Sequence, residues 1–454
     1  MTMRSINPAT GETLSIFDTW DEVHLSGVLQ SCAEIRPQWS ATPIQERCDL
    51  MRNAARVLRQ RRDELATTIT REMGKRIADA RAEVGKCADV CEYYAEMGPD
   101  FLADELIESD ASRSLVAYQP MGVVLAVMPW NFPLWQVFRF AAPSLVAGNV
   151  GLLKHASNVP QCALAIEDVF REAGFPENVF RSLMIPASMV AGVIGDNRVH
   201  AVTLTGSEPA GVSVASQAGK SLKKSVLELG GSDAFIVLED ADLEHTIKQA
   251  VSSRFLNTGQ SCIAAKRFIV VEKVAEEFVE RFRNAVAELK PGDPMDENTR
   301  LAPMARHDLR DELHKQVLTS LQAGAVAVIG CAPESHPGAY YQASILDHVK
   351  PGISAYDEEL FGPVAIVIRA KDEADAIQIA NSSRFGLGGS VWTQDSERGE
   401  RVARQLECGC AFVNGMVKSD PRLPFGGVKA SGYGRELSRH GIREFVNAKT
   451  IWIR

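Results

Sequence analysis

Cys262 is the residue of this sequence best placed to do chemistry. It ends the segment 257–262 (NTGQSC), which follows an amphipathic stretch over 242–256 and precedes the apolar run 268–271 (FIVV). A cysteine in a glycine-containing turn between a helix and a strand can stand clear of the backbone, and a thiolate is a strong nucleophile. Most free cysteines are instead buried structural residues. The sequence must therefore supply partners for this thiol elsewhere.

Four other stretches offer such partners, and each directly follows a predicted strand. Asn131, in 129–133 (PWNFP), has an amide that can donate to an oxyanion, and Glu228, in 228–231 (ELGG), is a candidate general base. Lys154 can reach a ribose or a phosphate. Gly206 and Ser207 open a predicted helix, whose free N–H groups can bind a pyrophosphate. A surface acid, a solvated lysine and an ordinary strand-to-helix turn are the alternatives for the last three sites.

These stretches share one edge of a predicted sheet. From residue 123, short apolar runs alternate with helical segments, which is typical of parallel strands with helices on both faces. Ligands bind such sheets beyond the carboxyl ends of the strands. A nucleophile, a carboxylate, an amide donor and a dinucleotide cradle together fit one reaction. In that reaction the thiol adds to a carbonyl, a hydride leaves to a nicotinamide, and water hydrolyses the thioester.

The predicted elements form two alternating series that meet near Gly230 and Gly231. Strands are predicted at 123–128, 150–153, 183–185, 201–205 and 226–227, and then at 234–238, 268–271, 325–329, 365–368, 390–393 and 411–414. Before them, Thr42 and Gln45 predict a capping box at the start of a helix that ends at Gly74. The tail, 448–454, reads as a strand with no local partner, which could join another sheet or another subunit.

Bulk properties limit the classes of function. The chain has 454 residues and a net charge of -9, which argues against a nucleic-acid or anionic-membrane partner. Its nine cysteines are scattered, with no CxxC pair and no zinc-type ligand set, so we expect no metal site and a reducing, cytoplasmic location. Residues 1–10 contain no apolar h-region, so we expect no secretory signal. The uncharged span 114–138 contains three prolines, which favour strands and a loop over a membrane helix.

Five motifs carry a resemblance to a known family. They are 129–133 (PWNFP), 228–231 (ELGG), 259–262 (GQSC), 359–363 (ELFGP) and 424–427 (PFGG). In this order and spacing the chain resembles the aldehyde dehydrogenase superfamily over nearly its whole length. Within that family it most resembles the bacterial NAD(P)-dependent succinate-semialdehyde dehydrogenases. The resemblance implies oxidation of an aldehyde to a carboxylate with NAD or NADP as cofactor.

The resemblance also implies a role for each site residue. Cys262 is the nucleophile, Asn131 and the Cys262 N–H hold the oxyanion, and Glu228 activates water. The remaining roles concern the cofactor. Lys154 binds the adenine ribose, and Gly206 and Ser207 bind the pyrophosphate. Glu359 and Phe361 lie at the nicotinamide ribose and ring, and Trp130 lies near the cofactor. Relatives strict for NAD often carry Glu at the position of Ser157. Because Ser157 does not repel a 2′-phosphate, we expect both cofactors to be used.

The substrate residues implied by the resemblance are less uniform. Arg139 occupies the place of an arginine that clamps the substrate carboxylate, although a structural salt bridge is an equal alternative. The second arginine of some relatives is Leu256 here, so Lys418 and Ser419 are the candidates to replace it. Some relatives carry a lysine in place of Phe140, which relays protons with the residue matching Glu436. Glu436 is therefore left out of the catalytic set.

The implied architecture is α/β. It comprises a Rossmann-like cofactor domain (1–110 and 123–229), a second α/β catalytic domain (230–433) and a small β oligomerisation element (111–122 and 434–454) that bridges a homodimer or homotetramer. Two alternatives to hydrolytic aldehyde oxidation stay open. A CoA-acylating relative would not need Glu228, and a non-catalytic protein on the same fold would be expected to lose Cys262, Asn131 or Glu228.

Overall fold

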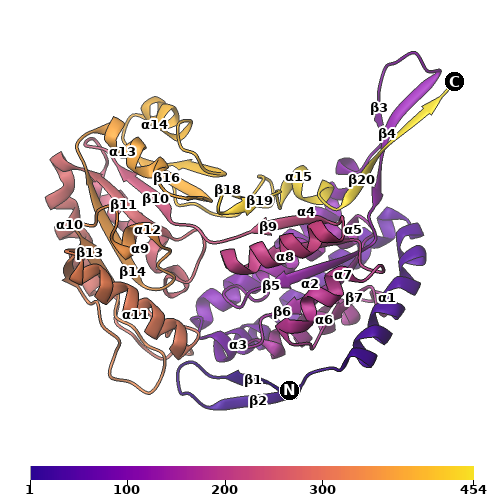
Figure 1. The fold of residues 1–454 in the computed structure, drawn as a ribbon, viewed down its shortest axis with the longest axis horizontal. Coiled ribbons are helices and arrows are strands. Elements are labelled where there is room, and N and C mark those ends of the chain that lie inside the picture. The colour runs from indigo at the N-terminus through magenta and orange to yellow at the C-terminus, as the bar shows by residue number, and fades with distance from the viewer. Residues whose placement is uncertain (1) are drawn as a thin grey trace.

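The computed structural model describes residues 2–454 and contains two large, mainly parallel sheets with helices packed around them, and a small sheet that projects from one end (Figure 1). The predicted α/β class is confirmed. Met1, the first residue of the predicted cofactor domain, lies outside the described residues. The predicted division into domains stays a prediction.

The first large sheet has six strands. Their order is β19 (Gly432–Tyr433), β9 (Lys224–Glu228), β8 (Ala201–Thr205), β5 (Val123–Met128), β6 (Val150–His155) and β7 (Phe180–Ser182). From β9 to β7 all neighbours are parallel, while β19 runs antiparallel to β9. The carboxyl ends of β5, β6, β8 and β9 therefore share one edge, as predicted. The connecting helices are α5 (Trp135–Val146), α6 (Pro160–Glu172), η1 (Ala187–Met189), α7 (Val190–Gly195) and α8 (Glu208–Lys220).

The N-terminal part packs against this sheet. It consists of the hairpin β1 (Thr2–Ile6) and β2 (Thr13–Asp18), followed by α1 (Glu22–Ala41), α2 (Ile44–Gln60), α3 (Arg62–Met73) and α4 (Ile77–Phe101). Gly74 ends α3 with a φ of 82°, the left-handed conformation that glycine adopts at low cost. The predicted capping box is wrong. The backbone N–H of Thr42 donates to Gln38 at the end of α1, and α2 begins after Pro43 without a side-chain cap.

The second large sheet has seven strands. Their order is β12 (Val326–Ile329), β13 (Ser344–Asp347), β14 (Val364–Ala370), β11 (Ala265–Val271), β10 (Asp233–Val237), β16 (Gly388–Trp392) and β17 (Cys410–Val413). All neighbours are parallel except β12 and β13. Successive residues of β10 enter different cores, since Phe235 and Val237 belong to one cluster and Ile236 to another. Both faces of this sheet are thus buried.

Helices and short strands complete this part of the chain. They are α9 (Leu243–Phe255), η2 (Leu256–Gly259), α10 (Glu272–Ala287), α11 (His307–Gln322), α12 (Ser354–Asp357), α13 (Glu373–Asn381), α14 (Ser396–Ala403), α15 (Ser438–Arg443), and the pair β15 (Phe385–Gly386) with β18 (Val428–Lys429). Two strand predictions need correction. Residues 183–185 lie outside β7, because Phe180–Ser182 pairs with β6 instead, and β13 was not predicted.

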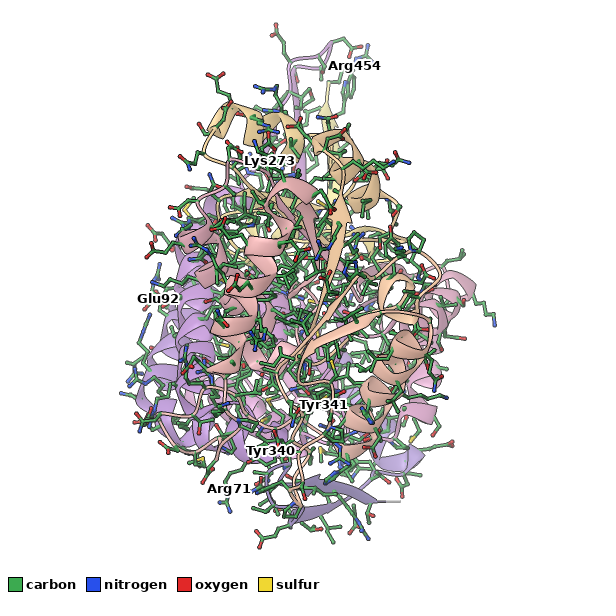
Figure 2. The ribbon with its side chains drawn as sticks, turned by 90° about the vertical axis from the view of Figure 1, so that its left-hand side faces the viewer. Arg71, Glu92, Lys273, Tyr340, Tyr341 and Arg454 are labelled. Atoms are coloured by element: carbon green, nitrogen blue, oxygen red, sulfur yellow. The ribbon has the colours of Figure 1, made fainter. Side chains whose placement is uncertain are left out.

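The third sheet forms the projecting arm. It contains β3 (Glu105–Leu106), β4 (Arg113–Pro120) and β20 (Val446–Ile453), in the order β20-β4-β3. Strand β20 pairs antiparallel with β4 from Val446 opposite Pro120 to Ile453 opposite Arg113. The tail therefore has no partner nearby in the sequence and joins a sheet with β4 of its own chain, in agreement with the prediction that it could add to another sheet. Figure 2 shows Arg454 at the tip of the arm and Arg71 and Tyr340 toward the opposite end.

The uncharged span 114–138 is not one helix. It contains most of β4, all of β5 and the first residues of α5, in agreement with the prediction of strands and a loop. Within residues 2–454, no helix combines the length and the apolar character that crossing a membrane requires.

Candidate active site

The segment that carries Cys262 has a strained backbone. After α9 ends at Phe255, Asn257 and Thr258 both adopt left-handed conformations, with φ of 52° and 56°. Such conformations cost a non-glycine residue on the order of 1 kcal/mol each. Gly259 follows with a φ of 72°, and a Cβ on it would lie 2.3 Å from the carbonyl oxygen of Gly362. Only glycine fits there without displacing the 359–363 loop.

Hydrogen bonds hold this conformation in place. The Asn257 side-chain amide donates to the carbonyl oxygens of Asn131 at 2.7 Å and Gln260 at 3.1 Å. The Thr258 hydroxyl donates to the carbonyl of Ala302 at 3.1 Å. The two strained residues therefore connect the nucleophile segment to the Asn131 loop and to the loop of Ala302, which joins α10 to α11.

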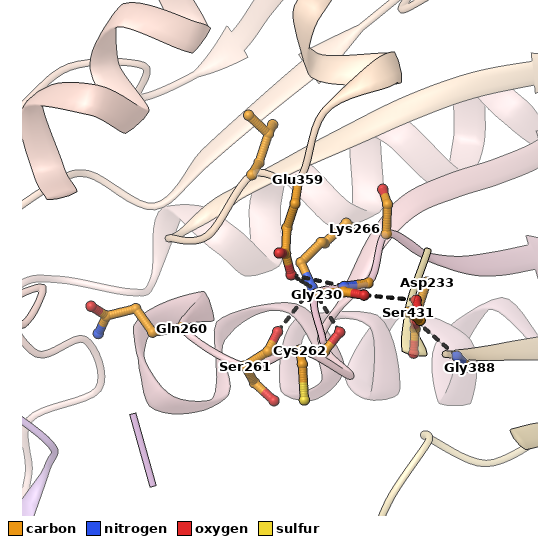
Figure 3. A network of polar contacts seen from close by, with 12 residues as sticks. Gly230, Asp233, Gln260, Ser261, Cys262, Lys266, Glu359, Gly388 and Ser431 are labelled. Carbon is orange, nitrogen blue, oxygen red and sulfur yellow. Dashed lines mark hydrogen bonds and ion pairs between the residues drawn. The ribbon is translucent and has the colours of Figure 1, made fainter. Parts of the chain in front are cut away.

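Lys266, on β11, links Cys262 to Glu359 (Figure 3). Its buried ammonium group donates to the carbonyl oxygens of Ser261 and Cys262, both at 2.9 Å, and lies 3.0 Å from a carboxylate oxygen of Glu359. An ammonium has three N–H donors, and here each has an acceptor. Lys266 thus fixes the main chain of the nucleophile relative to Glu359.

Cys262 lies between two cavities. The larger, of about 300 Å³, is also lined by Trp130, Asn131, Gly206 and Glu359, among others. The smaller, of about 200 Å³, is also lined by side chains of α4, α5 and the 416–419 loop. The side chain of Cys262 is half-buried and belongs to both walls. One sulfur atom can therefore meet a ligand from each side.

The thiol of Cys262 is protonated at neutral pH. Burial raises its pKa to about 12, whereas Arg139 and Lys266 act in the opposite direction and Glu359 raises the pKa further. A thiol with this pKa must lose its proton as the sulfur attacks, because the thiolate is the nucleophilic form. The positive charges of Arg139 and Lys266 favour that loss.

The side chain of Asn131 is oriented for donation. Its amide nitrogen donates to the carbonyl of Gln260 at 3.0 Å, and its amide oxygen accepts from Gln136 at 3.2 Å. The oxygen is thus identified by its donor, and the nitrogen keeps a second proton. Since Asn131 lines the larger cavity beside Cys262, this proton is available to a ligand oxygen.

Two buried charges position the loop of Asn131. The ammonium of Lys75 donates to the carbonyl of Asn131 at 2.9 Å and forms an ion pair with Glu83. Glu83 in turn accepts the N–H groups of Leu134 and Trp135, at 2.9 and 3.0 Å, at the start of α5. A carboxylate at a helix N-terminus satisfies free N–H groups and the helix dipole. The pair thereby fixes both the loop and the helix that follows it.

Glu228 lies behind the site. Its carboxylate is buried against Gly426, where a Cβ would stand 2.6 Å from one of its oxygens, and neither oxygen has a hydrogen-bond partner within residues 2–454. It is not among the residues that line either cavity. Burial raises its pKa well above the usual value, and the nearby Glu436 raises it further, while Arg139 lowers it. Glu228 must therefore turn toward Cys262 before it can act on a ligand there.

Arg139 is engaged in a buried ion pair. Its guanidinium contacts the carboxylate of Glu436, donates to the Thr205 hydroxyl at 3.3 Å and lies 4.9 Å from the ring centre of Phe425. This is the salt-bridge alternative considered from the sequence. Arg139 also lines the smaller cavity, so the structure leaves its role as a carboxylate clamp a prediction. Phe140 packs against Phe445 instead of reaching Glu436.

The larger cavity has features that fit a dinucleotide. Ser207 precedes α8, and its hydroxyl makes no capping bond within the described chain, so the first N–H groups of this helix remain free for an anion. Gly230 gives room to Glu359, since a Cβ at Gly230 would lie 2.2 Å from a Glu359 oxygen. The rings of Trp130 and Phe361 meet edge to face at 5.8 Å. Gly206, Ser207, Glu359, Phe361 and Trp130 thus all line this cavity.

Two predicted cofactor residues lie outside that cavity wall. Lys154 is buried and donates to the carbonyl of His155 at 2.6 Å, and burial lowers its pKa to about 8. Ser157 is exposed just beyond β6.

His155 accepts the N–H of Ala156 at Nδ1, so its Nε2 carries the proton and donates to the carbonyl of Pro133 at 2.8 Å. His155 therefore steadies the loop of Asn131, and burial lowers its pKa to about 4.

The predicted substrate residues gather at the smaller cavity. Arg139, Leu256, Lys418 and Ser419 all line it, together with Cys262. Lys418 is exposed, whereas Ser419 is buried.

Sequence reasoning missed five polar residues at the site. These are Lys75, Lys86, Gln136, Arg254 and Lys266. Arg254, for example, is fully buried on α9 and donates to the carbonyl of Leu360 at 2.9 Å and to that of Gly362, which holds the loop of Glu359 and Phe361. The one available signal was a basic residue inside an apolar helix or strand, as at Lys266.

Comparison with known proteins gives consistent matches. A family model described as the aldehyde dehydrogenase family matches residues 1–451. A probable succinate-semialdehyde dehydrogenase [NADP(+)] of Synechocystis sp. is 52% identical and covers 100% of both chains. The succinate semialdehyde dehydrogenase [NAD(P)+] of Escherichia coli is 50% identical over 99% of this chain and 97% of its own. A crystal structure of succinic semialdehyde dehydrogenase from Streptococcus pyogenes with NADP+ superposes with a TM-score of 0.98, at 40% identity over 99% of both chains.

Proposed function

The chain belongs to the aldehyde dehydrogenase family, and on that premise we propose that it oxidises succinate semialdehyde to succinate with NAD or NADP. The observation that carries the proposal is the position of Cys262 between two cavities. A cofactor in the larger cavity and an aldehyde in the smaller one would meet at the same sulfur atom. The near relatives from Synechocystis and Escherichia coli are named for this substrate.

The side chains support a reaction in two stages. The thiol of Cys262 releases its proton to solvent as its sulfur bonds to the aldehyde carbon, and the resulting oxyanion accepts the second N–H of Asn131 and the backbone N–H of Cys262. NAD(P), when bound, accepts the hydride that this carbon loses. A thioester then remains on Cys262. Glu228 takes a proton from water, the water oxygen bonds to the thioester carbon, and the carbon–sulfur bond breaks to release the acid.

Steady-state kinetics on a panel of aldehydes with both cofactors test this proposal. We expect succinate semialdehyde to have the highest kcat/KM, and NADP and NAD both to support the reaction. Product analysis with and without CoA should give the free acid in both cases. Equal kcat/KM for charged and uncharged aldehydes would contradict the substrate assignment while leaving the aldehyde dehydrogenase chemistry intact.

Asn131→Ala is expected to lower kcat/KM about 10²- to 10³-fold, because one donor to an oxyanion is worth about 2.7–4 kcal/mol. The variant should keep its affinity for the cofactor, measured by fluorescence titration. His155→Gln is a useful comparison, because His155 reaches the carbonyl of Pro133 and not the cavity. A loss in Asn131→Ala no larger than in His155→Gln would contradict the oxyanion role.

Ser157→Glu is expected to raise the KM for NADP by at least about 10-fold and to leave the KM for NAD within a factor of three. The reason is that a carboxylate beside the ribose repels a 2′-phosphate but can accept hydroxyl hydrogen bonds. Initial rates with each cofactor measure the effect, and Ser157→Gln controls for side-chain volume. Parallel changes for NADP and NAD would show that residue 157 does not contact this part of the cofactor.

The remaining expectations extend this proposal to the assembly. We propose a homo-oligomer in the cytoplasm, bridged by the arm of β3, β4 and β20. The arm exposes apolar side chains at Leu106, Ile107, Trp452 and Ile453, which a partner subunit would cover. All nine cysteines are free thiols, which suits a reducing compartment.

A further inference from the structure

We propose that Lys86 is the cation that binds the remote carboxylate of succinate semialdehyde in the smaller cavity. This inference rests on the proposed function and names a residue for its specificity. Lys86 lies on α4, and its ammonium donates to the hydroxyl of Ser419 at 2.7 Å. The same nitrogen lies 4.0 Å from the ring centre of Trp135. Lys86, Ser419 and Trp135 line the cavity together with Cys262.

The contacts of Lys86 leave it free to bind an anion. An ammonium has three N–H donors, and the Ser419 hydroxyl accepts one of them. A carboxylate placed at the cavity face of Lys86 could accept from the remaining ammonium protons and, after the hydroxyl rotates, from Ser419 as well. The Trp135 ring provides an electron-rich surface beneath the cation and holds it in place.

The other charges of this cavity are already paired, with the exception of Lys418. Arg139 pairs with Glu436, Lys75 with Glu83, and Asp79 with Arg76. Among the lining residues in 2–454, the two cations without an ion-pair partner within 4 Å are Lys86 and Lys418. Lys418 is exposed to water. Lys86 is therefore the unpaired cation whose binding to a carboxylate would be weakened least by water.

The electrostatic surroundings of Lys86 also favour an incoming carboxylate. Burial lowers its pKa to about 8, and Arg139 lowers it further, while Cys87, Glu83 and Asp420 act in the opposite direction. A bound carboxylate would stabilise the charged form of the lysine. Leu256, where some relatives place a second arginine, contributes an apolar wall to the same cavity.

Lys86→Met tests this inference, with succinate semialdehyde and the uncharged butanal as substrates. We expect the variant to raise the KM for succinate semialdehyde about 10- to 100-fold, because a hydrogen bond to a charged group is lost. The kcat for succinate semialdehyde and both constants for butanal should stay within a factor of three. Lys86→Arg should restore part of the affinity. Lys418→Met tests the rival cation of this cavity, and Lys273→Met, on the exposed side of α10 and outside both cavities, is the control that should resemble the wild type.

A pH series supplies a second readout. In the wild type, the KM for succinate semialdehyde should rise as the pH passes above about 8, since free Lys86 is charged below its pKa and neutral above it. Lys86→Arg should remove this rise, and butanal should not show it in either protein. These comparisons distinguish a loss of the Lys86 charge from a loss of folded protein, because unchanged kinetics with butanal require an intact active site.

The outcomes distinguish the two proposals. A wild-type enzyme that does not prefer succinate semialdehyde over butanal would overturn the substrate assignment and this inference with it. A normal preference with equal losses for both aldehydes in Lys86→Met would overturn the inference alone. A selective loss in Lys418→Met with a normal Lys86→Met would assign the carboxylate to Lys418 instead.

Discussion

Replacing Cys262 with alanine is expected to lower kcat for every aldehyde by more than about 10⁴-fold, because the covalent path loses its nucleophile. The stopped-flow trace should show no burst of NAD(P)H, since no thioester can form. The variant should fold, because the side chain of Cys262 is half-buried and borders two cavities, so its removal disturbs little packing. Thermal unfolding and cofactor titration would confirm an intact protein.

Cys408→Ala provides the matched control for Cys262. Cys408 is also a half-buried free thiol but lines neither of the two cavities at the nucleophile. The Cys408→Ala substitution should leave the burst unchanged.

In the wild type, alkylation of Cys262 by iodoacetamide should become about tenfold faster per pH unit between pH 7 and 10, because its pKa of about 12 makes the thiolate the minor species throughout. Activity that survives in Cys262→Ala would contradict the assignment.

Glu228→Gln is expected to separate the two stages of the reaction. The variant should still give a burst of about one NAD(P)H per active site, since the thiol and the oxyanion donors are intact. Its steady-state rate should fall about 10²- to 10⁴-fold, the usual contribution of a general base. Rapid-mixing absorbance measures both phases, and mass spectrometry of the quenched protein should detect the thioester. A missing burst, or an unchanged steady-state rate, would each contradict the role of Glu228 in hydrolysis.

The buried position of Glu228 adds a pH dependence to this prediction. Its pKa is raised by burial and by Glu436, so the carboxyl group carries a proton at low pH and must lose it to accept one from water. The wild-type steady-state rate should therefore rise with pH, while the burst amplitude stays constant. In Glu228→Gln the rise attributable to this group should disappear.

Much of the fold was predictable because buried parallel strands are short, apolar and regularly interrupted by helices. The bounds of β5 and β8 agree with the prediction residue for residue, since all their side chains except that of the half-buried Val127 are buried. Strand β13 has only four residues, with polar Ser344 and Asp347 at its ends, so no apolar run marks it. Residues 183–185 form an apolar run, yet the strand pairs with β6 over the neighbouring 180–182, and Leu183 adds one further bond to the carbonyl of Leu153.

The residues expected to contact the substrate carbon could be predicted from the sequence better than the residues that hold them in position. Cys262 and Asn131 follow strand or turn patterns that put them near each other, and the structure joins them to one cavity. Gln136 orients Asn131 through a contact only five residues away, but Lys86 and Ser419 meet across 333 positions. Such pairs depend on how α4 packs against the 416–419 loop. No local pattern in the sequence records that packing.

Three buried cations hold the loops of this site by their main-chain oxygens. Lys75 binds the carbonyl of Asn131, Lys266 those of Ser261 and Cys262, and Arg254 those of Leu360 and Gly362. A carbonyl oxygen is present whatever side chain the loop residue carries. The framework that sets the loop geometry is therefore separate from the side chains that contact ligands. Redesign of substrate range could exploit this separation by exchanging cavity-facing residues while keeping the three cations unchanged.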